Sequence, residues 1–117
     1  MSKPARIPKA LSKGEAEFAL HCQLEGLHPE PEYVFSRRRY RFDFAFVPQK
    51  LAVEIEGGIW VQGRHNRASS IEADFAKYAL AAILGWRVIR VSTAQVMSGD
   101  AIKWTLEALG CATVNVK

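Results

Sequence analysis

The sequence predicts an α/β fold, in which helices flank a mixed β-sheet, and three observations lead to this prediction. The segment from Arg39 to Trp60 alternates apolar and polar residues with the period of two that is typical of a β-hairpin. Apolar residues recur at helical spacing before and after this segment. A helix and a further strand follow the hairpin, and this strand-helix-strand order favours parallel pairing of the two strands. The predicted order is helix, hairpin, helix, strand, helix.

The hairpin is organised around the short loop 47–50, where Pro48 occupies a position that needs no hydrogen-bond donor. If the loop closes symmetrically, Phe46 pairs with Leu51, and this pair determines the register of both arms. A shift by one residue would place charged side chains in the apolar layer, so the hydrophobic pattern supports the same register. The face that we expect to be buried comprises Tyr40, Phe42, Phe44, Phe46, Leu51, Val53 and Ile55.

Three carboxylates are expected on the opposite face of the hairpin. In the predicted register Asp43 lies opposite Glu54, and Glu56 lies further along the same face, opposite Arg41. Cross-strand neighbours have Cβ atoms about 5 Å apart, so Asp43 and Glu54 repel each other unless a cation lies between them. Carboxylate oxygens are typical ligands of Mg²⁺. The alternative is a solvated face on which arginines neutralise the carboxylates, but the glycine pair 57–58 indicates a close backbone approach and favours the metal site.

A first helix is expected before the hairpin, from about Lys13 to Leu27. Ser12 and Glu15 have the spacing of a capping box, in which each side chain binds a backbone N–H group at the start of a helix. The inward face of this helix carries Phe18, Ala19 and Cys22. The segment 33–35 is then expected to be a short extended lead-in to the hairpin.

A second helix is expected after the hairpin, where Ser69 and Glu72 form another capping-box pattern and Gly85 suits the position after the last turn. Lys77 lies on one flank of this helix, where the simplest interpretation is a surface ion pair with Asp74. Helical spacing defines the face that we expect to be buried: Ile71, Phe75, Ala79, Ala82 and Ile83.

The last third of the predicted domain is a strand and a helix. The segment Trp86–Val91 is largely apolar, which is typical of a strand well inside a sheet. Ser98 or Asp100 is expected to cap a helix over about 101–109. At 117 residues the chain is long enough for one domain with a sizeable core.

Basic residues concentrate in a few segments. Residues 1–12 are expected to form a basic flexible arm, and residues 13–117 a single domain. Basic segments beside an acidic site suit DNA, because phosphate contacts supply most of the sequence-independent affinity; an arm that serves only solubility is the alternative. A second basic cluster enters the hairpin: Arg37, Arg38, Arg39 and Arg41. The loop after the hairpin adds groups that can bind phosphate or protonate a leaving oxygen: Arg64, His65 and Arg67.

The sequence predicts a cytoplasmic protein without a membrane partner. No continuous apolar segment follows the basic first residues, and no run approaches the roughly 18 apolar residues of a membrane span. Cys22 and Cys111 are isolated in the sequence, which is typical of thiols in a reducing compartment.

Asp43, followed eleven residues later by Glu54-Ile55-Glu56, resembles the D…(D/E)xK core of the PD-(D/E)xK nuclease superfamily. The longer pattern RFDFAF…LAVEIEGGIW…GRH…D..KY…A..LGWRVIRV is similar to small phage and prophage endonuclease-like proteins related to the very-short-patch-repair endonucleases. The similarity spans about Glu15 to Val91. It implies a restriction-endonuclease-like fold, a mixed β-sheet core flanked by helices, with Mg²⁺ as the cofactor and Mn²⁺ able to substitute.

The resemblance also implies roles for individual residues. Glu56 stands where the motif normally has a lysine, and it would orient the attacking water or help to hold a second ion. Lys77 is the candidate that would supply the missing cation from the second helix. The family often has a helical glutamate beside the metal, a role that is open to Glu15 in addition to capping. The implied metal ligands are Asp43, Glu54, the Ile55 carbonyl and Glu56.

The sequence therefore predicts a metal-dependent DNA endonuclease that hydrolyses phosphodiester bonds, is phage or prophage encoded, and acts in DNA processing, recombination or repair. His65 would assist at the scissile phosphate, while the arginines of both basic segments would hold the DNA backbone. A small nuclease that cuts both strands commonly needs two active sites, so a homodimer is one of the expected states. Two other classes stay open: a non-catalytic nucleic-acid-binding module that keeps the fold, and a structural or partner-binding protein.

Overall fold

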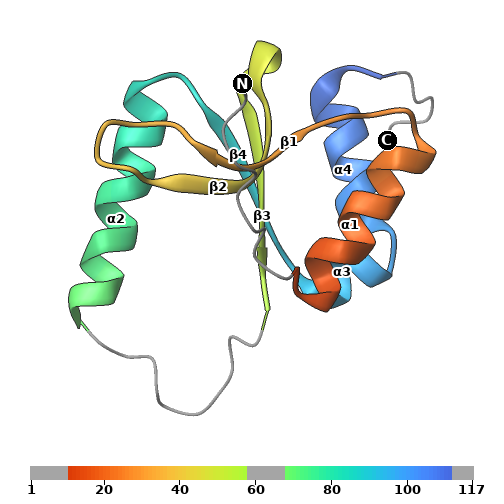
Figure 1. Cartoon of the computed structure of the whole chain (residues 1–117), viewed down its shortest axis with the longest axis horizontal. Helices are drawn as coiled ribbons and strands as arrows, with labels where there is room; N and C mark the ends of the chain where they lie inside the picture. The colour runs from red at the N-terminus through yellow and green to blue at the C-terminus, as the bar shows by residue number, and fades with distance from the viewer. Residues whose placement is uncertain (1–10, 58–67, 112–117) are drawn as a thin grey trace, which may run out of the picture.

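The computed structural model describes residues 11–57 and 68–111, which form a four-stranded mixed sheet with helices on both faces (Figure 1). Helix α2 covers one face of the sheet, and α1, α3 and α4 lie together on the other (Figure 1). This arrangement confirms the predicted α/β class. No helix within the two described stretches has the length and apolar character needed to cross a membrane. The elements in chain order are α1 (Lys13–Leu24), β1 (Glu30–Val34), β2 (Arg41–Phe46), the 3₁₀ turn η1 (Val47–Gln49), β3 (Leu51–Glu56), α2 (Ala68–Ile83), β4 (Arg87–Ser92), α3 (Thr93–Met97) and α4 (Asp100–Leu109).

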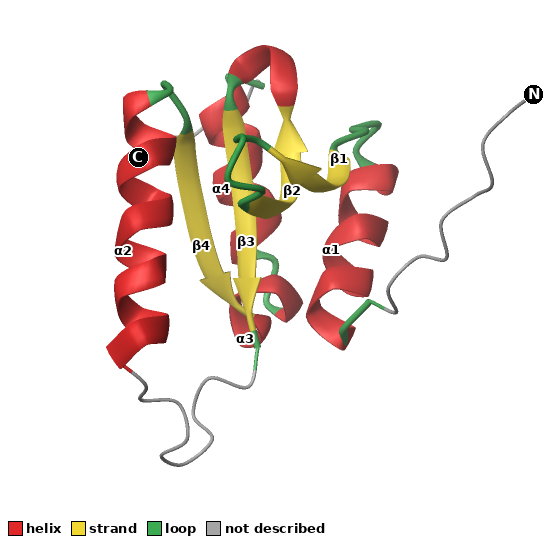
Figure 2. Cartoon of the chain, turned by 60° about the vertical axis from the view of Figure 1, so that its left-hand side comes forward, coloured by secondary structure: helices red, strands yellow, loops and turns green. Residues whose placement is uncertain are grey.

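The strands are ordered β1-β2-β3-β4, with antiparallel pairing except between β3 and β4, which run parallel (Figure 2). The pair Phe46 and Leu51 confirms the predicted hairpin register. Two expectations were wrong. The lead-in is longer than expected and forms a strand, β1, that pairs with β2. The Trp86–Val91 segment gives β4, an edge strand with Arg87 and Arg90 exposed. The inner strands are β2 and β3, and the first five residues of β3 are buried.

The sheet separates two apolar cores. The core under α2 contains Phe42, Ala45, Ala52, Ala81 and Trp86. The core under α1, α3 and α4 contains Phe18, Cys22, Phe44, Phe46, Leu51, Val53, Ile55, Val91, Val96 and Ala101. Phe42 and Phe44 therefore lie in different cores, and the expected single apolar face of β2 was wrong. The alternation breaks at Asp43, and in β1 the residue across from it, Glu32, has a positive φ of 49°, so both strands are irregular at this point.

Helix α1 begins as predicted and lies close to β3. The Glu15 N–H donates to Ser12 Oγ at 3.1 Å, and the Ser12 N–H donates to Glu15 Oε1 at 3.0 Å. Gly14 permits the close approach, because a Cβ atom there would lie 2.8 Å from Thr93 Oγ1 and 2.9 Å from Ile55 Cγ2. A Cβ atom on Gly57 would likewise lie 3.1 Å from Thr93 Oγ1, in keeping with the close approach expected at this glycine.

The orientation of α2 differs from the prediction. The helix begins at Ala68, so Ser69 is not its N-cap. The face predicted to be buried points outward: Ile71 is 44% exposed, Phe75 69% and Ile83 77%. The inner face instead carries Ala81 and two polar residues, Lys77 and Tyr78, that reach the buried Glu54. Periodicity could not reveal this, because α2 is apolar around most of its circumference.

The last two helices differ from the prediction in their first residues. An additional short helix, α3, follows β4 directly, and Ser92 and Gln95 form its capping box. Helix α4 then begins at Asp100, and its N-cap is Gly99 in place of the expected Ser98 or Asp100. Ser98 still contributes to this end of the helix, because its Oγ accepts a hydrogen bond from the Asp100 N–H at 3.2 Å. Gly110 ends this helix as predicted, at a φ of 79° that favours glycine.

Candidate active site

Asp43 lies where the pairing between β2 and β3 stops. The last paired residues are Phe44 and Val53. One step beyond, Asp43 Oδ2 accepts a hydrogen bond from the Ile55 N–H at 2.8 Å. The carboxylate therefore replaces a backbone partner. Because the N–H and C=O groups of one strand residue point to the same edge, the Ile55 carbonyl also faces the Asp43 side of β3.

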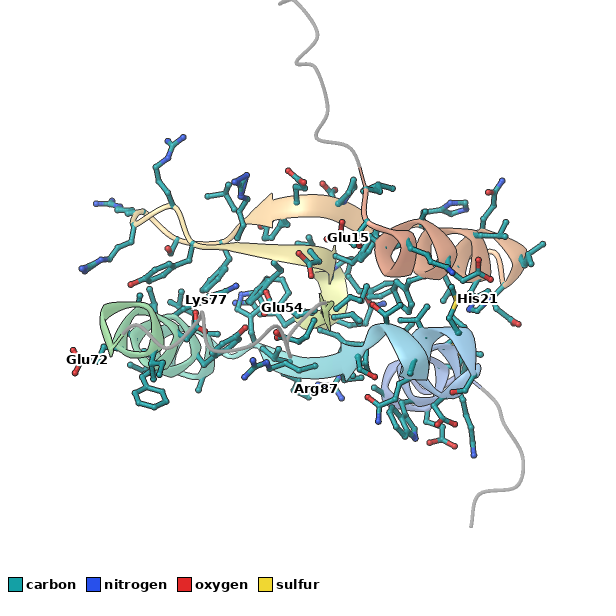
Figure 3. The ribbon with its side chains drawn as sticks, turned by 90° about the horizontal axis from the view of Figure 1, so that it is seen from below. Glu15, His21, Glu54, Glu72, Lys77 and Arg87 are labelled. Carbon is teal, nitrogen blue, oxygen red and sulfur yellow. The ribbon has the colours of Figure 1, made fainter. Side chains whose placement is uncertain are left out.

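The environment of Asp43 is acidic and partly dehydrated. The pKa of Asp43 is raised to about 6, mainly by burial and also by the nearby carboxylates of Glu15 and Glu54, against the opposing effects of the Ile55 hydrogen bond and of Lys77. Glu15 approaches from α1, while Glu54 and Lys77 lie side by side between the sheet and α2 (Figure 3). The predicted proximity of Asp43 and Glu54 is present, and Glu15, 8% exposed, contributes to the same local potential.

Glu54 is a buried carboxylate, 5% exposed, and both of its oxygens are bound by side chains of α2. Lys77 Nζ lies 2.6 Å from Glu54 Oε2. The Tyr78 hydroxyl donates a hydrogen bond to Glu54 Oε1. Burial, together with this hydrogen bond to a carboxylate, raises the pKa of Tyr78 well above its ordinary value. The structure thus gives Lys77 an ion pair with Glu54 in place of the expected surface pair with Asp74.

Glu56, at the end of β3, has a cationic partner that was not predicted. Its Oε2 accepts hydrogen bonds from Arg90 Nη2 at 2.8 Å and from Arg90 Nε at 3.1 Å. The expected pairing of Arg41 with Glu56 was wrong. Arg41 pairs with Val34 of β1, and its Nη1 lies 3.6 Å from Glu32 Oε1. The reason is topological: β1, which was expected only as a short lead-in, supplies the partner of Arg41, and the parallel strand β4 supplies Arg90 to Glu56.

Comparison with solved structures finds a similar fold in the "Homing Endonuclease I-Bth0305I Catalytic Domain". The TM-score is 0.62, the sequence identity is 15%, and the match covers 83% of this chain and 92% of that domain. The protein has a nuclease-like fold. This likeness agrees with the predicted fold class of a mixed sheet flanked by helices. No family model matches the sequence, and no curated protein matches it.

The predicted DNA-binding arginines that the structure describes lie at and beside the turn between β1 and β2. Ser36 organises this turn, since its Oγ accepts hydrogen bonds from the N–H groups of Arg38 at 3.2 Å and Tyr40 at 3.4 Å. Four exposed side chains project from the turn and the start of β2: Arg37, Arg38, Arg39 and Arg41. The other predicted phosphate-binding or catalytic groups, Arg64, His65 and Arg67, and the basic arm up to residue 10, lie outside the described residues.

The oxygen atoms around Asp43 fit a Mg²⁺ ion that has few protein ligands. Asp43, Glu54 and the Ile55 carbonyl offer oxygen atoms, the ligand type that Mg²⁺ requires. Within 11–57 and 68–111, no three Asp, Glu, His or Cys side chains are grouped closely enough to hold a metal by themselves. Mg²⁺ usually keeps several waters and uses only one or two carboxylates, so such a cluster is not needed. The carboxylates of Glu15 and Glu54 add to the burial that raises the pKa of Asp43, and this negative potential favours a cation at the site.

Two residues of this region were not predicted as functional. Tyr78 follows Lys77 in the sequence, and no partner was predicted for it. Arg90 belongs to the segment 86–91, which was predicted only as a largely apolar strand. The register that pairs Arg90 with Glu54 across β3 and β4 is the signal that could have indicated its place.

Proposed function

We propose that this protein is a metal-dependent endonuclease that hydrolyses phosphodiester bonds in DNA. The observation that carries the proposal is the meeting of Asp43, Glu54 and Lys77 at one point of a nuclease-like fold. The similar domain is named as the catalytic domain of a homing endonuclease, which supports DNA as the substrate class. A phage or prophage origin, and a role in DNA processing, recombination or repair, belong to the proposal through the sequence resemblance stated above.

In the proposed site, Asp43, Glu54 and the Ile55 carbonyl hold Mg²⁺, and Mn²⁺ can replace it. When bound, the ion would supply Lewis acidity toward the phosphodiester and would favour ionisation of the attacking water. Asp43, with its pKa near 6, is mostly ionised at neutral pH and available as a ligand. The hydrogen bond from the Ile55 N–H holds one Asp43 oxygen in place, while the other accepts no hydrogen bond from the described residues.

Lys77 takes the role of the lysine that the motif lacks. Its ammonium group, 2.6 Å from Glu54, can stabilise negative charge that develops on the phosphate during hydrolysis. Glu56 orients the attacking water or helps to hold a second ion, and His65 protonates the leaving oxygen. For Glu56 the described contact is the ion pair with Arg90, with Arg90 Nη2 2.8 Å from Glu56 Oε2.

The proposed DNA-binding surface begins at the exposed arginines of the β1–β2 turn, which can contact phosphates with planar, bidentate geometry. Arg64 and Arg67 belong to the same proposal. A homodimer would supply two active sites for cutting both strands. The outward apolar stripe on α2, with Phe75 69% and Ile83 77% exposed, is a surface that such an assembly could use.

One observation favours the alternative of a non-catalytic nucleic-acid-binding module. Lys77 and Tyr78 engage both oxygens of Glu54. In the alternative, this ion pair replaces the metal permanently and the fold only binds DNA. The two functions differ in one measurable property, because only the nuclease requires Glu54 to accept a metal.

The deciding experiment incubates the protein with supercoiled, linear, single-stranded and four-way-junction DNA in the presence of Mg²⁺, Mn²⁺ or a chelator. We expect metal-dependent cleavage of at least one substrate, and loss of that cleavage in Asp43→Ala. The matched control is Asp74→Ala, which removes an exposed carboxylate from α2. DNA binding without cleavage in either metal, with no metal bound in calorimetry, would favour the binding module. Full activity of a folded Asp43→Ala would refute the assignment of the site.

A further inference from the structure

Tyr78 and Arg90 connect Glu54 to Glu56 on the face of β3 that α2 covers. The Tyr78 hydroxyl donates to Glu54 Oε1. The Arg90 guanidinium lies over the Tyr78 ring, 4.8 Å from its centroid, and binds Glu56 through two nitrogens. Arg90 also pairs with Glu54 in the β3–β4 register. These contacts connect Glu54, Tyr78, Arg90 and Glu56, and each of these side chains restrains the ones that it contacts.

Tyr78 is better suited than Lys77 to orient the Glu54 carboxylate. A tyrosine has a rigid ring and few rotamers, whereas a lysine is a mobile point charge on a four-carbon stem. Tyr78 and Lys77 bind different oxygens of Glu54, so the two contacts together define the plane of the carboxylate. Each carboxylate oxygen has a second acceptor position, which leaves Glu54 able to bind a metal while both contacts persist.

Arg90 restrains the Tyr78 ring from one side. A guanidinium over an aromatic face is attracted by the ring quadrupole. Glu56 holds the guanidinium in this place, with an Nη2 to Oε2 distance of 2.8 Å. Lys77 Nζ lies 5.2 Å from the centroid of the same ring. The tyrosine is therefore held by two cations, and Glu56 can influence Glu54 without touching it.

We propose that Tyr78 is a positioning residue, which orients the Glu54 carboxylate for metal binding, and that Arg90 supports Tyr78 in this role. The inference rests on the proposed function, because it assigns Tyr78 and Arg90 to the metal site of that function. Partners that orient a metal ligand typically change metal affinity or activity by about 10–100-fold when they are removed. The same size of effect is expected for the Tyr78 hydroxyl.

The test compares Tyr78→Phe with Tyr33→Phe, which removes a hydroxyl from another partly buried tyrosine, one that packs against Trp86 under α2. Calorimetric titration of the DNA-free protein with Mn²⁺ or Mg²⁺ measures the metal affinity directly. We expect Tyr78→Phe to weaken metal binding by about 10–100-fold and Tyr33→Phe to leave it unchanged. High metal concentration should restore cleavage by Tyr78→Phe, whereas a fold defect would persist at every metal concentration.

Arg90→Gln provides a second test, and Arg87→Gln is its control from the same strand. Arg87 is exposed, and its Nη2 donates to the Ala108 carbonyl at 3.3 Å, away from the carboxylates. If Arg90 acts through the tyrosine, adding Arg90→Gln to Tyr78→Phe should weaken metal binding no further. If the losses of metal affinity in Arg90→Gln and Tyr78→Phe were fully additive, the proposed support of Tyr78 by Arg90 would be refuted.

The outcomes separate this inference from the proposed function. Metal-dependent cleavage by the wild type, with unchanged metal affinity in Tyr78→Phe, would overturn only the inference. A wild type that neither binds metal nor cleaves DNA would overturn both. Weaker metal binding in Tyr78→Phe, recovered cleavage at high metal concentration and normal binding in Tyr33→Phe would support the role of Tyr78.

Discussion

Replacing Asp43 with asparagine should stabilise the metal-free protein at neutral pH while abolishing metal-dependent cleavage. Asparagine keeps the size of the side chain and can still accept the hydrogen bond from the Ile55 N–H. It removes the negative charge that burial, Glu15 and Glu54 disfavour. A residue that improves function at a cost in stability is typical of an active site.

The magnitude follows from the pKa of Asp43. Its rise from an ordinary 3.8 to about 6 means that the folded protein holds more protons than the unfolded chain between these values. The free energy of unfolding therefore falls as the pH rises through this window, and the full cost is present above about pH 6. At about 1.4 kcal/mol per pH unit the cost is at most roughly 3 kcal/mol. Partial exposure of the carboxyl group reduces it to about 1–2 kcal/mol.

Urea denaturation followed by circular dichroism, with a chelator present, measures this difference at pH 7.5 and at pH 3.5. We expect Asp43→Asn to exceed the wild type by about 1–2 kcal/mol at the higher pH and to lose that advantage at the lower pH. Asp74→Asn, which changes an exposed carboxylate of α2, serves as the control. Equal stability at pH 7.5, or the same gain at both pH values, would refute the electrostatic account of this site.

Further predictions concern the other parts of the structure. Lys77→Ala should lower the cleavage rate at saturating metal without weakening metal binding, since a cationic side chain is not a metal ligand; weaker binding in calorimetry would contradict this. Phe75→Glu should change the free energy of unfolding by no more than about 0.5 kcal/mol, because Phe75 is 69% exposed. Phe42→Ala should lower it by about 3–5 kcal/mol in urea denaturation, because Phe42 is 0% exposed. Gly14→Ala should cost about 1–3 kcal/mol through contact with α3 and β3, and a neutral result would show that α1 can shift. Deleting residues 1–9 should make the dependence of log DNA affinity on log salt shallower by about 0.9 per lost phosphate contact, and an unchanged slope would assign the arm to solubility.

Features that depend on residues close together in the sequence were predictable. The turn at 47–50 and the alternating arms gave the pairing of Phe46 with Leu51. Ser12 and Glu15, three positions apart, gave the start of α1. The strand-helix-strand order gave the parallel pairing of β3 and β4. In each case a short-range pattern has one favourable local conformation, so the residues themselves contain the information.

The position of Asp43 beside Glu54 was also within reach of the sequence, because it depends only on the hairpin register. The hydrogen bond that fixes it was not, since the Asp43 carboxylate takes a backbone N–H that a regular ladder would have paired. The break in alternation that sends Phe42 and Phe44 to different cores belongs to the same irregularity. Local propensity carries no information about this break in alternation, because the break arises where two strands and the helices on both faces of the sheet meet.

Only the tertiary structure decided which side of α2 faces the sheet. From Phe75 to Leu84 the helix has one charged residue, Lys77, so an apolar stripe can be drawn on more than one side. Burial of Glu54 selects among these sides, because a buried carboxylate needs a cation and hydrogen-bond donors, and Lys77 and Tyr78 can supply them only if they turn inward. The sequence by itself identified Asp43, Glu54 and Lys77 as candidates. The packing of α2 against β3 brings these residues together, since Glu54 and Lys77 are 23 positions apart in the sequence. In this packing, the free-energy cost of burying the Glu54 charge without partners outweighs the gain from burying Phe75 and Ile83.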